Sequence, residues 1–448
     1  MTAEQEYPIT LVNVIDPRNG LPLDSLSEPL GILYIAAYAK RYGYDTTVKD
    51  LGYLLMNATK RHGLEQLCDF CCNRHTRVLA ISCMSAGLPL AILIAERCRK
   101  MYPDLWIIMG GHGPTILPRG IKEKINYVDY IVEGEGEKAF VGILDEIYRG
   151  GKRAKENSPQ IVSATSCDLD EIPCPDRSTI PAEGYFITLS TSRGCPYNCT
   201  YCASKLMWKG KMKIRTPISV MSEIEDIVEK LRCGIIARQD EGRVVISDDT
   251  FIHSYEWLKE LSAMFSKNKT NIQFTCYSRI EQMNDNIALM LKNMGCVDLK
   301  FGVESGSNKV LREISTKKNK EIILEVCSRA KEILGVVSAS FIYGFPFETL
   351  DDFMETVSLV KELTQKGIRC KFNPLVVYPG TDIYCRYSDG YELVDEYVSK
   401  VMESESLTRE LNENVLELIM DNPEMFLNFM THRNALMNEK WQLLYTAI

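Results

Sequence analysis

Short apolar segments rich in β-branched residues alternate with helix-length amphipathic segments along most of this 448-residue chain. Parallel strands need a long crossover connection, which is usually a helix, so this alternation is typical of parallel sheets. The segments form two sets, separated by a polar, proline-containing stretch at residues 151–184 that we expect to be a linker. The sequence therefore predicts an α/β fold with one parallel sheet in each half of the chain.

The first set predicts a Rossmann-like, doubly wound parallel sheet within residues 1–150. Ligands of such sheets bind beyond the carboxyl ends of the strands, and the glycine-rich segments Gly110–Gly113 and Gly134–Gly136 follow predicted strands there. Glycine permits a ligand to approach the backbone closely. The predicted strands are Ile9–Ile15, Thr46–Lys49, Val78–Ser82, Trp106–Gly110 and Tyr127–Val132, and the predicted helices include Leu30–Arg41, Leu88–Met101 and Glu137–Tyr148.

The second set, at residues 185–384, predicts six β/α units, too few to close an eight-stranded barrel. A helical C-terminal region at 385–448 follows, with amphipathic patterns at Val394–Met402 and Glu413–Met420. We expect Met425, Phe426, Phe429 and Met430 to belong to a core there. The predicted strands of the partial (β/α)6 barrel are Tyr185–Thr191, Arg243–Ser247, Ile272–Ser278, Val297–Val303, Val337–Tyr343 and Lys371–Val377.

Three cysteines, Cys195, Cys199 and Cys202, follow the first predicted barrel strand in a C-x-x-x-C-x-x-C spacing. Cysteine thiolates are the usual ligands of iron–sulfur clusters, and a loop of this size can bind three irons of a four-iron cluster. The fourth iron is then open to a substrate or cofactor, as the open position of catalytic zinc is. The alternatives are a structural zinc loop or chance clustering among the 16 cysteines of the chain.

This loop, with Tyr201 before its last cysteine, resembles the signature of the radical S-adenosylmethionine (radical SAM) enzymes. The resemblance implies an open six-unit barrel that binds a 4Fe-4S cluster and SAM at its strand ends. The pair Asp248 and Asp249 ends the second strand, where a carboxylate can accept hydrogen bonds from the amine of SAM. The residues that match the family's SAM-binding motifs are Tyr201, Asp248, Asp249, Ser278, Arg279, Glu304, Ser305, Gly344, Pro346 and Tyr378.

The glycine-rich strand ends of the first half resemble the cobalamin-binding domain that precedes the radical domain in one branch of this family. The matching residues are Ser82, Ser85, Gly110, Gly111, His112, Gly134, Glu135 and Gly136. Many cobalamin domains have a cobalt-binding histidine in a D-x-H-x-x-G loop, but the comparable loop here, Asp16–Gly20, has none. The resemblance therefore implies cobalamin without a histidine from that loop. His112 either faces the corrin or is satisfied by backbone groups in a turn.

A second metal site is conceivable at Cys68, Cys71, Cys72 and His75. These residues lie in a helix-like segment, and buried cysteine behaves as a small hydrophobic residue. We expect the cysteines to be core residues.

The resemblance implies a cobalamin-dependent radical SAM methyltransferase. A 5′-deoxyadenosyl radical would abstract hydrogen from an unactivated carbon of a small-molecule or natural-product substrate, and methylcobalamin would supply the methyl group. The alternative is a cobalamin-dependent enzyme without methyl transfer, which catalyses an oxidative cyclisation, ring contraction or rearrangement. An RNA-methylthiolating enzyme would need further cluster cysteines and a basic C-terminal module, and a cobalamin-binding regulator would have no need of the three-cysteine loop.

The net charge of −8 argues against a nucleic-acid partner. No apolar run reaches the length of a membrane span, and the N-terminus does not resemble a secretory signal. We therefore expect a cytoplasmic enzyme that is a monomer or a weak dimer. Its implied partners are a small-molecule substrate and an external electron donor of the flavodoxin or ferredoxin type.

Overall fold

A computed structural model describes residues 8–15, 26–151, 158–237, 243–393 and 406–447, and its chain forms two compact units. The first unit comprises residues 1–186, 230–239 and 393–429, and the second comprises 187–229, 240–392 and 430–448. The C-terminal segment is thus divided between the units at residues 429 and 430. Within the described residues, no helix has both the length and the apolar composition needed to cross a bilayer.

The first unit contains a six-stranded parallel sheet in the order β3-β1-β4-β5-β6-β7. The order reverses between β1 and β4, which makes this pair the topological switch point of a doubly wound sheet. The expected strands are present, and β7 adds a strand within the segment expected to be a linker. The strands are β1 (Ile9–Val14), β3 (Thr46–Asp50), β4 (Val78–Cys83), β5 (Trp106–Gly110), β6 (Tyr130–Glu133) and β7 (Gln160–Ser163).

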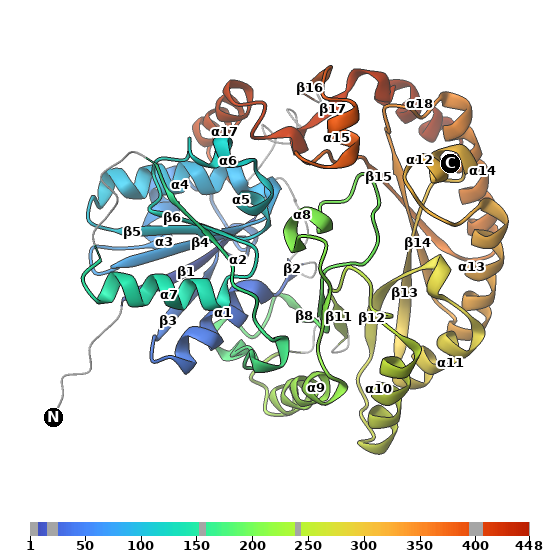
Figure 1. The fold of residues 1–448 in the computed structure, drawn as a ribbon, viewed down its shortest axis with the longest axis horizontal. Helices are drawn as coiled ribbons and strands as arrows, with labels where there is room; N and C mark the ends of the chain where they lie inside the picture. The colour runs from blue at the N-terminus through green and yellow to red at the C-terminus, as the bar shows by residue number, and fades with distance from the viewer. Residues whose placement is uncertain (1–7, 16–25, 152–157, 238–242, 394–405, 448) are drawn as a thin grey trace. The chain divides into compact units, whose positions relative to one another are not determined.

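Helices cover both faces of this sheet (Figure 1). Successive side chains of a strand point to opposite faces, so Leu11 joins a core with α1 and α7, and Val12 joins a core with α3, α4 and α17. The expected core residues Met425, Phe426 and Phe429 belong to the second of these cores. The helices are α1 (Leu30–Arg41), α2 (Leu51–Met56), α3 (Leu64–Cys71), α4 (Leu88–Met101), α5 (His112–Ile116), α6 (Arg119–Lys122), α7 (Glu137–Tyr148) and α17 (Arg409–Asp421).

The second unit contains the open parallel sheet β15-β14-β13-β12-β11-β8 of a half-barrel. All six strands follow the sequence prediction, with ends that differ by a few residues. The strands are β8 (Tyr185–Leu189), β11 (Val244–Ile246), β12 (Phe274–Arg279), β13 (Cys296–Glu304), β14 (Val337–Tyr343) and β15 (Arg369–Pro374). The first two residues of β8 belong to the first unit, where they pair with β2 (Leu26–Ser27). Two short antiparallel pairs are β9 (Ser192–Arg193) with β10 (Lys213–Ile214), and β16 (Tyr391–Leu393) with β17 (Met430–His432).

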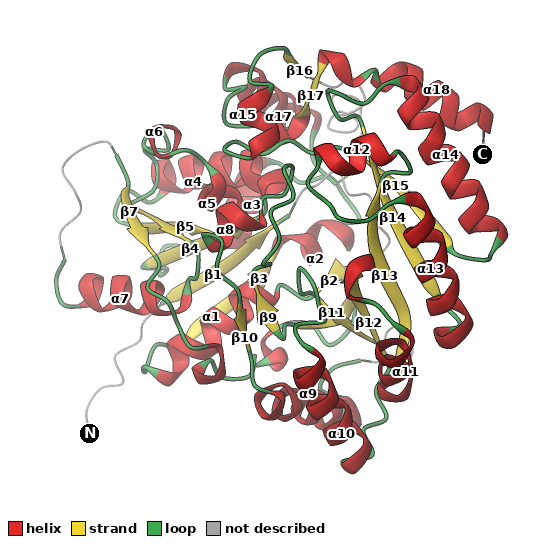
Figure 2. Cartoon of the chain, turned by 45° about the vertical axis from the view of Figure 1, so that its right-hand side comes forward, coloured by secondary structure: helices red, strands yellow, loops and turns green. Residues whose placement is uncertain are grey.

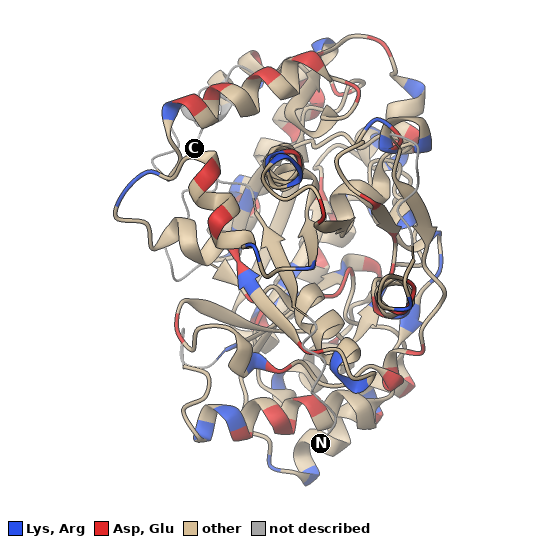
Figure 3. Cartoon of the chain, turned by 90° about the vertical axis from the view of Figure 1, so that its left-hand side faces the viewer, with Lys and Arg blue, Asp and Glu red and all other residues tan. Residues whose placement is uncertain are grey.

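The helices of the half-barrel lie along one side of this sheet, as the view in Figure 2 shows for α11, α13 and α14. Leu299, Phe301 and Val303 of β13 point to that side and are completely buried. Acidic and basic residues are interspersed along the helices rather than segregated (Figure 3). The helices are α8 (Ser204–Trp208), α9 (Pro217–Arg232), α10 (Tyr255–Lys267), α11 (Asp285–Met294), α12 (Asn308–Glu313), α13 (Lys320–Leu334), α14 (Leu350–Gln365), α15 (Asp382–Arg386) and α18 (Met437–Ala447).

Candidate active site

The three-cysteine loop leaves the carboxyl end of β8 and brings its thiols together in a partly buried position. The Sγ of Cys199 accepts a hydrogen bond from Arg279 at 3.4 Å, and the Sγ of Cys202 accepts one from the backbone N–H of Ser204 at 3.5 Å. Burial, assisted by the neighbouring Cys199 and Cys195 thiols, raises the pKa of Cys202 to about 11. Burial thus favours the neutral Cys202 thiol, and a metal must displace its proton to bind.

Among the described residues, no three His, Cys, Asp or Glu side chains converge as ligands of one metal ion. A cluster does not require that convergence, because each thiolate binds a different iron.

Two adjacent carboxylates at the end of β11 hold the two ends of the cysteine loop. Asp248 is buried, and it accepts the backbone N–H groups of Thr191 at 2.8 Å and Ser192 at 3.1 Å. It also accepts a short hydrogen bond from the Thr191 hydroxyl. Asp249 is exposed and accepts the hydroxyl of Ser204, two residues after the last cysteine, at 2.7 Å. Asp248 therefore fixes the start of the loop and Asp249 its end.

Arg279, the last residue of β12, touches the loop from a neighbouring strand. Its guanidinium donates to Cys199, lies 3.9 Å from the centre of the Tyr197 ring and donates to Glu281 at 2.9 Å. Its buried Nε has no hydrogen-bond partner within the described part of the chain. Ser278 points to the opposite face of the sheet, is buried, and its hydroxyl donates to the Arg279 carbonyl at 3.4 Å.

A second charged group lies at the end of β13. Glu304 has a φ of +71°, a left-handed conformation that is uncommon for a residue with a side chain. Its carboxylate lies 4.0 Å from the Nζ of Lys318, and burial together with this carboxylate raises the pKa of the neighbouring Tyr201 hydroxyl. Burial lowers the pKa of Lys318, whose ammonium also donates to the Gly302 carbonyl at 2.6 Å. Ser305 is fully buried and bonds to Thr356 of α14 at 3.0 Å.

The loop after β14 is braced by the C-terminal helix α18. Gly344 has a φ of +92°, and a Cβ there would lie 2.6 Å from the Sδ of Met437. Its N–H donates to Glu348 at 2.9 Å, and the fully buried Lys440 donates to the same carboxylate at 2.7 Å. Pro346 is buried within this loop. Tyr378, after β15, is half-buried, and its carbonyl accepts the N–H of Thr381 at 3.3 Å.

Neither Lys318 nor Lys440 was identified from the sequence. Lys318 lies in a polar segment before α13, and Lys440 lies in a helix without a recognisable motif. Neither segment signals a buried lysine, because lysines are mostly exposed.

In the first unit, the expected cobalamin-binding residues gather at the carboxyl ends of β4, β5 and β6. Gly111 has a φ of +94°, and a Cβ there would lie 2.8 Å from the carbonyl oxygen of Cys83 and 2.9 Å from the hydroxyl of Ser82. Thr115, which was not predicted, donates to the Gly111 carbonyl at 2.6 Å and accepts the Gly134 N–H at 3.1 Å. These bonds join the two glycine-rich loops.

The other predicted residues of this edge are also fixed. Ser85 and the Nδ1 of His112 lie 3.0 Å apart, and burial lowers the pKa of His112 to about 4. Glu135 accepts the Cys167 N–H at 3.0 Å, and a Cβ at Gly136 would lie 2.6 Å from Ile35. Gly110 is less restricted, because a Cβ there would meet Val132 at 3.7 Å. At this edge the Cβ positions of Gly111 and Gly136 are already filled by neighbouring protein atoms, so these glycines let the chain segments pack closely.

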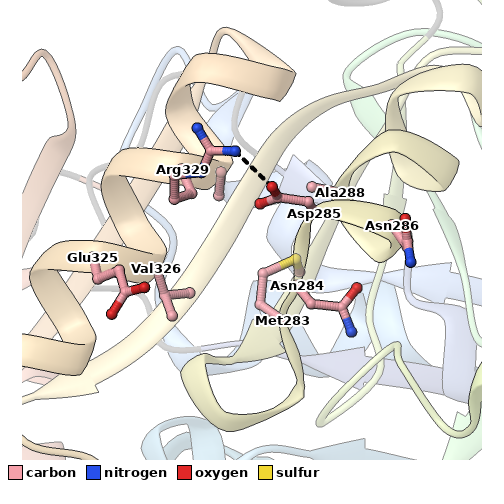
Figure 4. Close-up of a pocket in the computed structure, with 9 residues that line it drawn as sticks. Met283, Asn284, Asp285, Asn286, Ala288, Glu325, Val326 and Arg329 are labelled. Atoms are coloured by element: carbon pink, nitrogen blue, oxygen red, sulfur yellow. Dashed lines mark hydrogen bonds and ion pairs between the residues drawn. The ribbon is translucent and has the colours of Figure 1, made fainter.

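The remaining predictions fall elsewhere. The loop Asp16–Gly20, including Arg18, and the pattern Val394–Met402 lie outside the described residues. Cys68, Cys71 and Cys72 are completely buried in the core beside α4, and the Sγ atoms of Cys72 and Cys98 lie 3.6 Å apart. A hollow between α11 and α13, lined by Asn284, Asp285, Glu325 and Arg329, contains none of the predicted site residues (Figure 4).

Comparisons with known proteins match both units. The Radical SAM superfamily model matches residues 189–360, and the B12 binding domain model matches residues 21–144. The chain is 26% identical over 329 residues, 68% of each chain, to the uncharacterized methyltransferase PH0819 of Pyrococcus horikoshii. It is 22% identical over 432 residues to the anaerobic magnesium-protoporphyrin IX monomethyl ester cyclase of Rubrivivax gelatinosus, covering 89% of this chain and 73% of the cyclase.

Among solved structures, the fold is similar to that of the radical S-adenosylmethionine methyltransferase TsrM from Kitasatospora setae, with cobalamin and a [4Fe-4S] cluster bound. The TM-score is 0.74 at 16% identity, over 99% of this chain and 91% of TsrM. The chain combines a B12-binding domain with a radical SAM domain. It therefore belongs to the cobalamin-dependent radical SAM enzymes, whose cofactors are a 4Fe-4S cluster, SAM and cobalamin.

Proposed function

We propose that this enzyme is a methyltransferase that methylates an unactivated carbon of a small-molecule or natural-product substrate. The observation that carries the proposal is the similarity to the Pyrococcus methyltransferase, which extends over 329 residues and thus over more than either matched domain alone. The bound cofactors would supply the carbon-centred radical and the methyl group. The chain itself must position the reactants and exclude water.

Cys195, Cys199 and Cys202 would hold three irons, leaving the fourth for SAM. Arg279 contacts Cys199 and has an unpartnered Nε among the described residues, so it is placed to bind the carboxylate of SAM beside the cluster. Asp249 is the exposed carboxylate at the neighbouring strand end and suits the SAM amine.

Other predicted residues would act through these groups. Asp248, Ser278 and Ser305 are buried and already bonded to protein atoms, so we assign them a positioning role. Glu304, Tyr201 and Lys318 form a charged group beside the cluster loop that would orient the ribose side of SAM. Gly344 and Pro346 would back the adenine, with α18 holding their loop in place, and Tyr378 would line the same end of the barrel.

In the first unit, the loops at Ser82–Ser85, Gly110–His112 and Gly134–Gly136 would bind cobalamin. Glycine at position 111 lets this loop pack directly against the end of β4, which would hold the loop in place beside the corrin. Burial keeps His112 neutral, and its Nδ1 forms a hydrogen bond with Ser85. The two side chains would therefore be held in place at the strand ends that bind the cofactor. The electron that starts each turnover would come from a flavodoxin- or ferredoxin-type donor.

The second candidate is a reaction without methyl transfer, such as an oxidative cyclisation. The similarity to the Rubrivivax cyclase favours it, because that alignment spans 89% of this chain, although at 22% identity. The two candidates share the site described above and differ in what becomes of the SAM methyl group.

The fate of SAM separates them. Holoenzyme reconstituted with cluster and cobalamin is supplied with reductant, SAM and a mixture of candidate small molecules, and the nucleoside products are quantified. A methyltransferase forms both 5′-deoxyadenosine and S-adenosylhomocysteine, with the methyl group of trideuteromethyl-SAM in the product. Formation of 5′-deoxyadenosine without S-adenosylhomocysteine would contradict the proposal and favour the second candidate.

A further inference from the structure

The sheet of the half-barrel has one face covered by helices and one inner face. Phe341, Tyr343 and Phe372 point to the covered face, where their rings contact one another and Phe353 of α14. Because side chains alternate along a strand, the neighbours of these residues, such as Ser340 and Lys371, point to the inner face.

The strand register places the inner-face residues in two rows. One row contains Arg279, Gly302, Ser340 and Lys371, in the order of strands β12, β13, β14 and β15. The next row, one step further from the carboxyl ends, contains Tyr277, Lys300, Ser338 and Arg369. Lys371 therefore lies at the level of Arg279, about 14 Å across the sheet at about 4.8 Å per strand.

Three of these cations have no carboxylate partner. Lys300, Arg369 and Lys371 form no ion pair with any described residue, and Lys300 lies 5.3 Å from the centre of the Tyr277 ring. The inner-face carboxylates are engaged elsewhere: Asp298 accepts the Ser338 hydroxyl at 2.9 Å, and Glu304 lies beside Lys318. The inner face is therefore basic in a protein whose net charge is −8.

Hydroxyl groups on the same face have unused capacity. The Nδ2 of Asn373 donates to the Ser340 Oγ at 2.9 Å, which leaves the Ser340 proton available to an acceptor. Deeper on the face, the buried Thr275 hydroxyl has no partner among the described residues. Ser340 lies opposite Lys371 in its own row and diagonally across from Lys300 in the next row, and a hydroxyl donor near two unpaired lysines is suited to an oxyanion.

We propose that Lys300, Ser340 and Lys371 form a subsite for an anionic group of the substrate, a carboxylate or a phosphate. This inference rests on the proposed function, because it takes the inner face as the substrate space. Anchoring the anion near β15 leaves the width of the sheet up to Arg279 for SAM and the reacting carbon. The exposed ring of Tyr277, beside Lys300, would contact an apolar part of the substrate.

The test measures binding without turnover. Full-length holoenzyme is equilibrated by dialysis with 2-naphthoate, with 2-naphthyl phosphate and with the neutral 2-naphthamide, and the bound fraction is quantified by chromatography. We expect the wild type to retain at least one of the two anions and to retain it better than the amide. Lys300→Met and Lys371→Met should each weaken that binding about tenfold, since each removes a charge-assisted hydrogen bond, and leave retention of the amide unchanged.

Lys361→Met is the matched control, because it removes the same charge from the exposed surface of α14. It should bind the anions as the wild type does. Equal retention of the anions and the amide by the wild type, including no retention of any of them, would overturn the subsite, as would full retention by both inner-face variants. Cluster content, cobalamin content and far-ultraviolet circular dichroism confirm that the variants are folded. S-adenosylhomocysteine formation is measured separately, so a failure of methyl transfer is distinguishable from a failure of anion binding.

Discussion

The carboxylate of Asp248 accepts the backbone N–H of Thr191 at 2.8 Å and the hydroxyl of the same residue, so the end of β11 holds the first residue of the cluster loop. The Nε2 of His253 lies 3.0 Å from the Thr191 hydroxyl and 3.7 Å from the Asp248 carboxylate. Asp249, which follows Asp248 in the chain, accepts a hydrogen bond from the Ser204 hydroxyl at the far end of the loop. Two adjacent carboxylates thus have different tasks, one buried within the scaffold and one exposed at the site.

Asp248→Ala should lower the amount of cluster that the protein retains, although Asp248 touches no iron. The substitution leaves the N–H groups of Thr191 and Ser192 without their acceptor, at about 1–3 kcal/mol for each buried donor. Iron per chain after anaerobic desalting measures the effect. Asp249→Ala, which removes one exposed hydrogen bond to Ser204, is the comparison and should retain more cluster than Asp248→Ala. Equal iron in the wild type and Asp248→Ala would refute the positioning role.

Arg279→Ala should weaken SAM binding by about ten- to a hundredfold, the value of a lost hydrogen bond to a charged partner. Asp249→Ala should act in the same direction. The cluster that each variant retains should keep its absorption spectrum, because neither residue is an iron ligand. Lys320→Met, which removes a lysine paired with Glu362, serves as the control. Unchanged SAM affinity in both site variants would remove these residues from the site.

Gly111→Ala should abolish or strongly weaken cobalamin binding. A single methyl group would be strained at φ +94° and would lie 2.8 Å from the Cys83 carbonyl, so the loop must move. Gly120→Ala is the control, because nothing lies within 4 Å of a Cβ there. The absorbance of bound corrinoid after gel filtration reports the result. Normal cobalamin content in Gly111→Ala would contradict the assignment of this edge.

His112 should make the stability of the protein depend on pH. Burial lowers its pKa to about 4 in the folded state, against about 6.5 in the unfolded chain, so the unfolded chain binds the proton more readily. The stability contribution is complete above pH 6.5 and is lost as the pH falls toward 4. At pH 5 the loss is about 2 kcal/mol.

Chemical denaturation at pH 7.5 and pH 5.0 tests this dependence. His112→Gln lacks the titrating group, so its unfolding free energy should fall less than that of the wild type by about 2 kcal/mol. If both proteins lose the same free energy, the imidazole is not buried in the way described.

The sequence was sufficient to predict the two parallel sheets, because most of their strands are short apolar runs bounded by polar or glycine-rich residues. The prediction was less complete where a polar segment contributes a strand: β7 lies in the expected linker and has only half-buried and exposed residues. Its place in the sheet depends on pairing with β6, which local composition does not reveal.

The sequence predicted which strand ends form the candidate site. It did not predict the direction in which individual side chains point. Ser278 and Arg279 are neighbours, yet alternation along β12 places them on opposite faces. Lys318 and Lys440 reach the site region from segments without a motif, and each is buried only because tertiary contacts supply a carboxylate. Such contacts join residues that are far apart in the chain, and a single sequence does not show them.

The most direct test of the central claim is iron and sulfide analysis of the variant in which Cys195, Cys199 and Cys202 are all replaced by Ala. We expect four irons per chain in the anaerobically reconstituted wild type and almost none in the triple variant. Replacement of Cys68, Cys71 and Cys72 by Ala is the matched control. The folded fraction of this variant should contain as much iron per chain as the wild type. Full iron retention in the first variant, or loss of iron in the folded second, would contradict the assignment and place the cluster on the other group of cysteines.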